Sequence, residues 1–320
     1  MLRPGLLSTI QDLGRYGFQH LGIVPCGAMD SIAHCLANAL VGNEDECATL
    51  ECTIAGPELR FEEDALVALY GAAFKAKNGT GLPGNRPVLV NAGMTINVGS
   101  AVRGSRAYLA IAGGFSVPPV LGSRSTYVPG SFGGFSGRAL RAGDRIETSE
   151  ILAALSNERF ARMAKPVRWS APELTVPPAG TLAVRAMEGR HWAQFDEPSR
   201  ETFFSQRWRV SATSNRMGYR LEGPRLARRR NVEVLSEPTC LGTVQVPNDG
   251  TPIALMADHQ TTGGYPKIAE IASADLPEMS QLAPGDLVRF VPCTLEQAQR
   301  AEDEKLARLR HVRYSIRSQF

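Results

Sequence analysis

The chain has 320 residues, 43% of them hydrophobic, which is enough for one large domain or two of medium size. Its formal net charge is only +3, with acidic and basic residues interspersed, and this gives no indication of nucleic-acid binding. The longest apolar stretch, residues 65–74, is too short to cross a bilayer. The six cysteines form no C-x-x-C pair, so we predict neither a disulfide framework nor a zinc ribbon. No secretory leader pattern is present, and the expected compartment is the reducing cytoplasm.

The first half of the chain is predicted to be mainly β. Short apolar segments follow one another through residues 49–112, separated by Gly, Pro or Asn. Such regular spacing with little helix is typical of a barrel or a sandwich. One helix is expected at about residues 32–40, where Asp30 or Ser31 would cap its first turn and Gly42 would end it.

A long segment rich in Gly, Ser and Pro, residues 118–138, follows these strands. Long irregular segments inside a domain are uncommon and are often functional. The chain has no Gly-Lys-Ser/Thr and no G-x-G-x-x-G between a strand and a helix, so the glycines do not predict a nucleotide-binding loop. We interpret the segment as a lid or an interface loop, in which Arg138 could contribute to an anion site.

Proline content and internal similarity indicate two modules. Residues 150–163 are helix-like, and four prolines between residues 166 and 178 indicate a linker at 166–180. Both halves contain a strand followed by Gly-Gly, and both contain a Leu-x-x-Gly-Asp segment in the same order. We therefore predict two tandem β-barrel modules, residues 1–165 and 181–293. A C-terminal helix is expected within 294–320, because Thr294 and Gln297 form a capping-box pattern; it should run towards Arg310, with fraying of residues 313–320.

The most unusual stretch follows a short apolar run at residues 253–257, which predicts a buried strand. A carboxylate, an imidazole, an amide, two hydroxyls, two glycines, a phenol and an ammonium lie within residues 258–267. A loop that only reverses the chain needs Gly, Pro, Asn or Asp at one or two positions. Because binding residues concentrate on loops held by rigid strands, we interpret this stretch as a site. The alternative is a polar hairpin with a satisfied Asp258 and a solvated Lys267.

Each group in this stretch suits a chemical role. Asp258 could orient a partner or move a proton, and Lys267 could neutralise a carboxylate, a phosphate or an oxyanion. The Gly263-Gly264 pair could expose backbone N–H groups to an anion. The predicted catalytic residues are Asp258, Gln260 and Lys267. The predicted substrate-binding residues are Gln245, Thr262, Gly263, Gly264, Tyr265, Arg216 and Arg138.

Three further residues carry alternatives. Arg216 could bind an anionic substrate, or it could form a salt bridge that locks its turn. Cys26 could be a nucleophile, but a small buried thiol is the favoured interpretation. His259 could be a proton carrier, but an exposed side chain without a role is the favoured interpretation, because one isolated histidine carries little information.

Two segments carry a family resemblance. Thr243-Val-Gln-Val-Pro247 and Asp258-x-Gln-Thr-Thr-Gly-Gly-Tyr-Pro-Lys267 resemble the signature of the KipA-like family. That family includes the biotin-dependent carboxyltransferase domain of urea carboxylase, proteins labelled allophanate hydrolase subunit 2, and the C subunit of bacterial 5-oxoprolinase. The segments Gln11-Asp-x-Gly-Arg15 and Gly27-Ala-Met-Asp30 are also similar to it, and Asn215 favours the 5-oxoprolinase-like members. The resemblance implies barrels of the cyclophilin-like kind.

The resemblance implies three possible functions. The first is a subunit of an ATP-dependent 5-oxoprolinase, which opens the lactam of 5-oxo-L-proline to L-glutamate. Its partners would be the smaller, KipI-like B subunit of 5-oxoprolinase and the lactam-binding A subunit, and a partner could hold the ATP. The second is a carboxyltransferase acting on urea or a related amide; biotin would arrive on another protein, since the chain lacks an Ala-Met-Lys-Met attachment site. The third is a non-catalytic regulator that binds a kinase-inhibitor protein.

Overall fold

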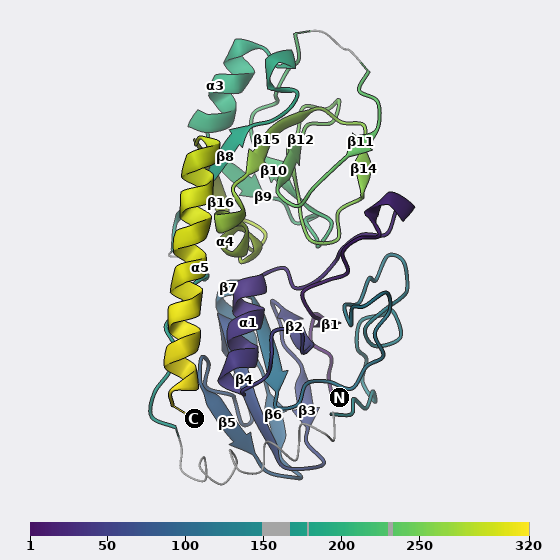
Figure 1. Ribbon diagram of the computed structural model, residues 1–320, viewed down its shortest axis with the longest axis vertical. Helices are drawn as coiled ribbons and strands as arrows, with labels where there is room; N and C mark the ends of the chain where they lie inside the picture. The colour runs from purple at the N-terminus through teal and green to yellow at the C-terminus, as the bar shows by residue number, and fades with distance from the viewer. Residues whose placement is uncertain (149–166, 178, 230–232, 320) are drawn as a thin grey trace. The chain divides into compact units, whose positions relative to one another are not determined.

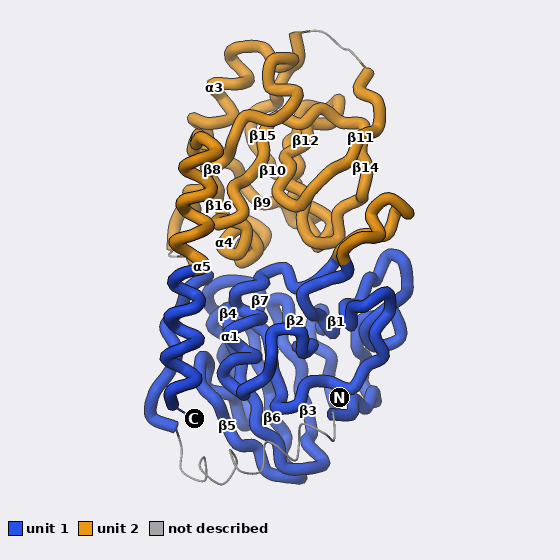
Figure 2. Tube along the Cα trace, viewed as in Figure 1, with its two compact units in different colours: residues 1–15, 26–176, 307–320 blue, residues 16–25, 177–306 orange. Residues whose placement is uncertain are grey.

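The computed structural model describes residues 1–148, 167–177, 179–229 and 233–319. The chain forms two compact units (Figure 2). The first consists of residues 1–15, 26–176 and 307–320, and the second of residues 16–25 and 177–306. The helix predicted at residues 150–163 lies outside the described residues. None of the described helices has both the length and the apolar character that crossing a membrane requires.

The main sheet of the first unit has five strands in the order β1-β2-β7-β4-β5, and all neighbours are antiparallel (Figure 1). Alternate residues of β4 are buried on opposite faces, as the period of a strand requires: Leu66 packs with the helix-side core, and Val67 with the core on the other face. The described strands of this unit form an open sheet, whereas the sequence predicted a barrel. The sheet can stay open because both of its faces are buried against apolar cores. The strands are β1 Leu7–Gln11, β2 Thr49–Thr53, β4 Ala65–Lys75, β5 Pro87–Val90 and β7 Ser100–Ile111, while β3 Glu58–Arg60 pairs with β6 Thr95–Asn97.

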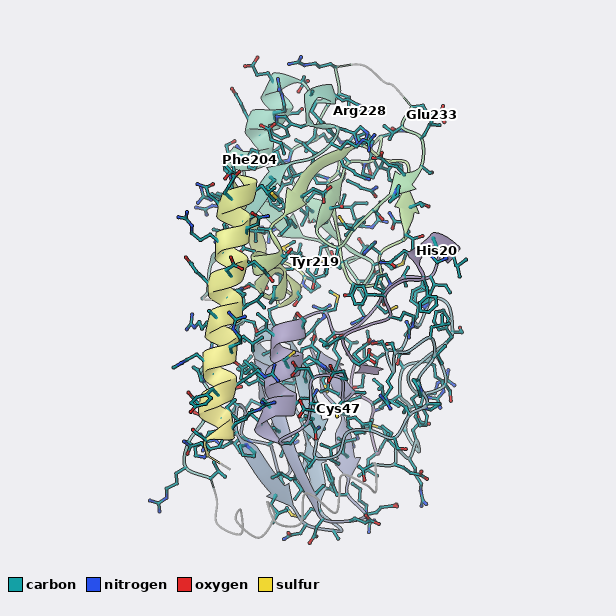
Figure 3. The ribbon with its side chains drawn as sticks, viewed as in Figure 1. His20, Cys47, Phe204, Tyr219, Arg228 and Glu233 are labelled. Carbon is teal, nitrogen blue, oxygen red and sulfur yellow. The ribbon has the colours of Figure 1, made fainter. Side chains whose placement is uncertain are left out.

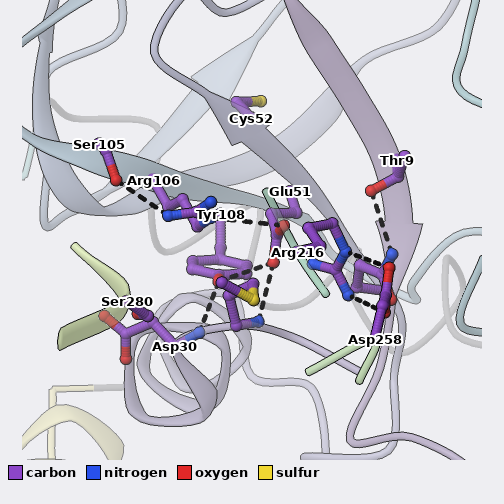
Figure 4. A network of polar contacts seen from close by, with 12 residues as sticks. Thr9, Asp30, Glu51, Cys52, Ser105, Arg106, Tyr108, Arg216, Asp258 and Ser280 are labelled. Atoms are coloured by element: carbon purple, nitrogen blue, oxygen red, sulfur yellow. Dashed lines mark hydrogen bonds and ion pairs between the residues drawn. The ribbon is translucent and has the colours of Figure 1, made fainter. Parts of the chain in front are cut away.

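Helix α1, Ser31–Leu40, covers one face of this sheet and begins where the sequence predicts. The Asp30 carboxylate accepts a hydrogen bond from the Ala33 N–H at 2.9 Å, which caps the first turn. The Asp30 N–H in turn donates to the Tyr108 hydroxyl at 2.8 Å, and that hydroxyl donates to Glu51 at 2.8 Å (Figure 4). The start of the helix is therefore fixed to β2 and β7 through one buried chain of hydrogen bonds.

The second unit is a closed barrel of seven strands in the order β10-β13-β12-β15-β8-β16-β9, and this confirms the barrel predicted for the second half. Closure leaves no unpaired strand edge in the ring. Phe203 and Phe290 are both fully buried and stack with ring centroids 4.5 Å apart. Tyr219, labelled in Figure 3, donates its hydroxyl hydrogen to the Ser280 carbonyl at 3.0 Å. The strands are β8 Thr181–Glu188, β9 Trp208–Val210, β10 Gly218–Glu222, β12 Thr243–Gln245, β13 Ile253–Leu255, β15 Lys267–Ile271 and β16 Leu287–Pro292.

The remaining elements surround these sheets. They are α3 Glu197–Ser205, α4 Leu276–Ser280, α5 Leu295–Arg317, the strands β11 Glu237–Pro238 and β14 Thr262–Gly263, and three 3-10 helices at Gln19–Leu21, Trp192–Gln194 and Ser273–Asp275. The capping box at the start of α5 is confirmed, because Thr294 and Gln297 exchange hydrogen bonds of 2.9 and 3.3 Å. The prediction that residues 313–320 fray is wrong as far as Arg317, since Ile316 is buried in the core of the first unit.

The Gln-Asp-x-Gly-Arg segment anchors the long Gly/Ser-rich loop within the first unit. The Asp12 carboxylate accepts hydrogen bonds from the Ser123 hydroxyl at 2.6 Å and the Ser125 hydroxyl at 2.5 Å. Arg15 is buried; it donates to the Ser125 carbonyl and lies 4.9 Å from the centroid of the Phe132 ring. Asp12 and Arg15 of this segment therefore attach the loop to the rest of the first unit.

Replacing Asp12 with Asn should loosen this loop. Burial raises the pKa of the Asp12 carboxyl, but the hydrogen bonds from Ser123 and Ser125 outweigh it, so the folded-state pKa lies below the ordinary value. The carboxylate therefore stabilises the fold above the unfolded-state pKa, and this contribution is lost as pH falls through the folded-state pKa. We expect Asp12→Asn to cost about 1–3 kcal/mol at pH 7 in urea unfolding, and less at pH 3. Asp303→Asn, at an exposed position, is the control; equal unfolding free energies for the two variants would contradict the assignment.

Candidate functional site

The predicted site lies in the second unit, where the chain leaves β13 and returns as β15. In the barrel Gln245 of β12 lies directly opposite Lys267 of β15. Between them in sequence, β14 pairs with β11, so that Gly263 lies opposite Glu237. The fold therefore brings four parts of the chain together: residues 190–191, 237–239, 245 and 258–267.

Two buried amides form the first part of the site. The Gln260 side-chain amide donates to Gln245 Oε1 at 3.1 Å. Gln245 is 1% exposed, and its Nε2 has no hydrogen-bond partner among the described residues. An amide donor that is buried without an acceptor costs free energy, and a native protein usually has a functional reason to keep one.

Gly263 makes room for this amide pair. A Cβ atom at this position would lie 2.7 Å from Gln245 Nε2 and 3.1 Å from Gln260 Nε2. Gly263 belongs to strand β14, and neither it nor Gly264 has a positive φ. The structure gives Gly263 a role that comes from its lack of a side chain, and the anion-binding role of the glycine pair stays a prediction.

Asp258 and Arg216 form a buried ion pair with two hydrogen bonds, of 2.9 and 3.0 Å, from the guanidinium to the two carboxylate oxygens (Figure 4). The Asp258 N–H also donates to the Arg216 carbonyl at 2.8 Å. Both side chains come from turns that follow or precede barrel strands. The pair matches the alternative in which Arg216 locks its turn, and it gives Asp258 a positioning role in this conformation.

Lys267 is buried and is not the solvated lysine of the hairpin alternative. Its ammonium donates to the Pro238 carbonyl and lies 2.9 Å from Glu237 Oε1. Glu237 also faces Arg190 at 3.3 Å and His191 Nε2 at 3.7 Å. The Lys267 ammonium beside it holds the pKa of Glu237 below its ordinary value, so the carboxylate stays charged.

His191 has a defined tautomer. Its Nδ1 accepts a hydrogen bond of 3.1 Å from the Lys267 backbone N–H, so the proton of the neutral ring is on Nε2, which faces Glu237. Burial lowers the pKa of His191 and thereby favours this neutral form. The Nε2–H of the neutral imidazole therefore faces the Glu237 carboxylate, at 3.7 Å from Oε1, which is beyond hydrogen-bond distance.

The other predicted residues lie apart from this cluster or at its edge. Thr262 and Tyr265 are exposed, and Gly264 approaches the backbone of residues 234–236. Arg138 belongs to the first unit, where it forms a bidentate pair with Asp144 at 2.7 and 2.8 Å. Their contributions to a substrate site remain predictions.

His259 and Cys26 are both buried. The prediction of an exposed His259 is wrong: its Nδ1 lies 2.7 Å from the Gln260 carbonyl and 3.3 Å from the Thr239 hydroxyl, and burial lowers its pKa. Cys26 is a buried thiol outside any disulfide, as predicted. All six cysteines are free, which agrees with the absence of a disulfide framework.

Sequence reasoning missed Glu237, His191, Arg190 and Thr239. Glu237 belongs to a two-residue strand, and so short an element has no periodicity to reveal it. The only available signal was electrostatic: a buried Lys267 requires an acid from elsewhere in the chain.

The sequence of the chain also matches a known protein family. Residues 21–292 match the family described as carboxyltransferase domain, subdomain A and B. The chain belongs to this family. The predicted resemblance is thus confirmed for the family as a whole.

The family members most similar to the chain include subunits and domains of enzymes. The C subunit of 5-oxoprolinase from Escherichia coli (strain K12) is 38% identical over 312 residues, which cover 95% of this chain and 94% of that protein. Its counterpart from Haemophilus influenzae, also a 5-oxoprolinase C subunit, is 35% identical over 91% of this chain and 90% of that protein. The crystal structure of the K. lactis urea amidolyase superposes with a TM-score of 0.87 at 30% identity, over 97% of this chain and 20% of that one.

Adding a methyl group at Gly263 should separate the two amides. We expect Gly263→Ala to lower the unfolding free energy by about 1–3 kcal/mol, because the Gln245 and Gln260 amides must yield to the new atom. The side-chain amide NMR signals of Gln245 and Gln260 should shift at the same time. Gly84→Ala is the matched control, since its Cβ would meet no atom closer than 3.9 Å. Unchanged amide signals in Gly263→Ala would refute this account of the glycine.

The Arg216–Asp258 pair should show strong coupling in a double-mutant cycle. Arg216→Gln and Asp258→Asn each leave one buried charge without its partner, which we expect to cost about 3–5 kcal/mol. The double variant leaves no charge, so it should cost less than the sum, with a coupling of at least about 1 kcal/mol. Urea unfolding of the four proteins measures this coupling, and simple additivity would mean that the pair is not an energetic unit.

Proposed function

We propose that the chain is part of an ATP-dependent 5-oxoprolinase, as one of its subunits, and that this enzyme opens the lactam of 5-oxo-L-proline to L-glutamate. The observation that carries this proposal is the nearly end-to-end match to the E. coli protein, at 38% identity over 94% of its length. The proposed partners are the smaller, KipI-like B subunit and the lactam-binding A subunit.

The chemistry calls for activation of a poor electrophile. The lactam nitrogen donates electron density to its carbonyl, so water does not readily attack the ring carbon. ATP would supply a phosphoryl group to the lactam oxygen and so make that carbon electrophilic. The sequence has no phosphate-binding loop of the P-loop type, so we assign the ATP phosphates to a partner subunit.

The chain's own groups are suited to holding an amide. In this proposal Gln245 Nε2, a buried donor for which the described residues supply no acceptor, would bind a carbonyl oxygen. Gln260 fixes the Gln245 amide in place through its hydrogen bond to Oε1. The Lys267 ammonium, on the neighbouring strand and opposite Gln245, can stabilise negative charge that develops on oxygen. Asp258 holds the connecting turn through Arg216, and we therefore assign it a positioning role.

A second candidate function is carboxyl transfer to urea or a related amide. It is supported by the family description and by the TM-score of 0.87 to the K. lactis urea amidolyase. The same amide-binding groups would serve, with carboxybiotin delivered by another protein. The two candidates differ in their co-substrate, and this difference makes them separable by assay.

Removing the Lys267 ammonium should abolish most of the activity of the reconstituted subunits. We expect Lys267→Ala to reduce ATP-dependent glutamate release by about 10²–10³-fold, the usual cost of losing one group that stabilises a developing oxyanion. Lys77→Ala, an exposed lysine of the first unit, is the control and should match the wild type.

The outcomes of this assay separate the proposals. Wild-type activity in Lys267→Ala would remove Lys267 from the site without affecting the family assignment. No glutamate release by the wild-type subunits, together with carboxybiotin-dependent carboxylation of urea, would replace the first function with the second.

A further inference from the structure

The three cations that could bind a substrate carboxylate all have carboxylates of this chain beside them. Arg216 is paired with Asp258, Arg138 with Asp144, and Lys267 with Glu237. The first two pairs are bidentate, and Arg216–Asp258 is buried on both sides. The third differs in both geometry and composition.

Glu237 is surrounded by more positive charge than one carboxylate needs. Its Oε1 lies 2.9 Å from Lys267 Nζ and 3.7 Å from His191 Nε2, while its Oε2 lies 3.3 Å from Arg190. Each oxygen therefore has its own basic partners, as in a site that recognises a planar carboxylate. His191 presents a proton here because its Nδ1 accepts from the Lys267 backbone.

Glu237 lies on a short ribbon outside the barrel. The ribbon pairs Glu237 with Gly263 and Pro238 with Thr262, and the Thr239 N–H donates to the Thr261 carbonyl at 3.0 Å. Nearby Leu235 is 85% exposed. The Arg190 side chain is 75% exposed, so the site is open to solvent on that side. Rotation of one side chain would vacate the position, and no strand of the barrel would have to move.

We propose that Lys267, His191 and Arg190 form a binding site for a small carboxylate, and that Glu237 occupies this site until a ligand carboxylate replaces it. The inference rests on the proposed function and deepens it, since 5-oxo-L-proline carries a carboxylate beside its lactam. Glu237 then sets specificity: a neutral lactam gains nothing by displacing it, whereas an acidic one takes over its partners.

The buried amide pair of Gln245 and Gln260 lies next to this site. Gln245 lies opposite Lys267 on the neighbouring strand, and Gly263 lies both beside the Gln245 amide and opposite Glu237. A ligand that bears an amide and a carboxylate could therefore reach both the amide pair and the Lys267 ammonium. The acid Glu270, whose pKa is raised by burial, completes the charged groups near Lys267.

Titration of the full chain with three probes tests this. The probes are 5-oxo-L-proline, 2-pyrrolidinone (the same lactam without the carboxylate) and inorganic phosphate. In Glu237→Gln the competing charge is gone, and we expect 5-oxo-L-proline to bind at least tenfold more tightly than to the wild type. This gain in affinity should be lost in the double variant Glu237→Gln/Arg190→Gln. The affinity for 2-pyrrolidinone should be the same in Glu237→Gln as in the wild type.

Any of three results would overturn the proposal: no gain for 5-oxo-L-proline, an equal gain for 2-pyrrolidinone, or a larger gain for phosphate. If Glu237→Gln does not fold, Arg190→Gln in the otherwise wild-type chain decides, because Arg190 is exposed. It should weaken 5-oxo-L-proline binding at least threefold, and unchanged binding counts against the site. Failure of the proposed function is distinguishable, since it appears as absent glutamate release by the wild-type subunits while the binding differences persist.

Discussion

The candidate site depends on one irregularity in the barrel, a bulge in the pairing of β12 with β15. Val244 lies opposite Ala269, but the next residue, Gln245, lies opposite Lys267, so Ile268 is the extra residue. Without the bulge Gln245 would lie opposite Ile268, and Lys267 would point to the other face of the sheet, because a shift of one residue reverses every side chain. The bulge thus brings the buried amide and the ammonium onto one face.

A second constraint is the small ribbon of β11 and β14, which assembles the site from outside the barrel. Gly263 lacks the side chain that would displace Gln245, and its neighbour across the ribbon, Glu237, is the counter-ion of Lys267. The Gln245–Gln260 amide pair and the Lys267–Glu237 ion pair are therefore coupled through Gly263 and Glu237, which lie opposite each other in the four-residue ribbon. Such an element has little pairing energy of its own, so the polar groups that it positions depend largely on one another.

Much of the fold could be predicted, because the signals were local. The cap at Asp30, the capping box at Thr294 and the short strands of the second half all depend on residues close in sequence. The cluster around Lys267 could be predicted only in part. Its decapeptide is recognisable by composition, but the bulge at Ile268 exists only in the pairing of two strands, and Glu237 approaches from a segment without periodicity. The burial of His259 is likewise tertiary, since it depends on contact with Thr239.

The two acids of the site illustrate why residue type alone does not assign a role. Asp258 and Glu237 each face a cation, yet their surroundings differ. Asp258 has both oxygens bonded by one guanidinium, and its own N–H donates to the backbone of that arginine, so pair and turn form a closed unit. Glu237 divides its two oxygens among three separate groups, and one of them is open to solvent. A closed unit stabilises a turn, because opening it would leave two buried charges unpaired. Lys267, His191 and Arg190 can exchange one carboxylate for another without that penalty. A ligand carboxylate would restore the same contacts that the Glu237 carboxylate gives up.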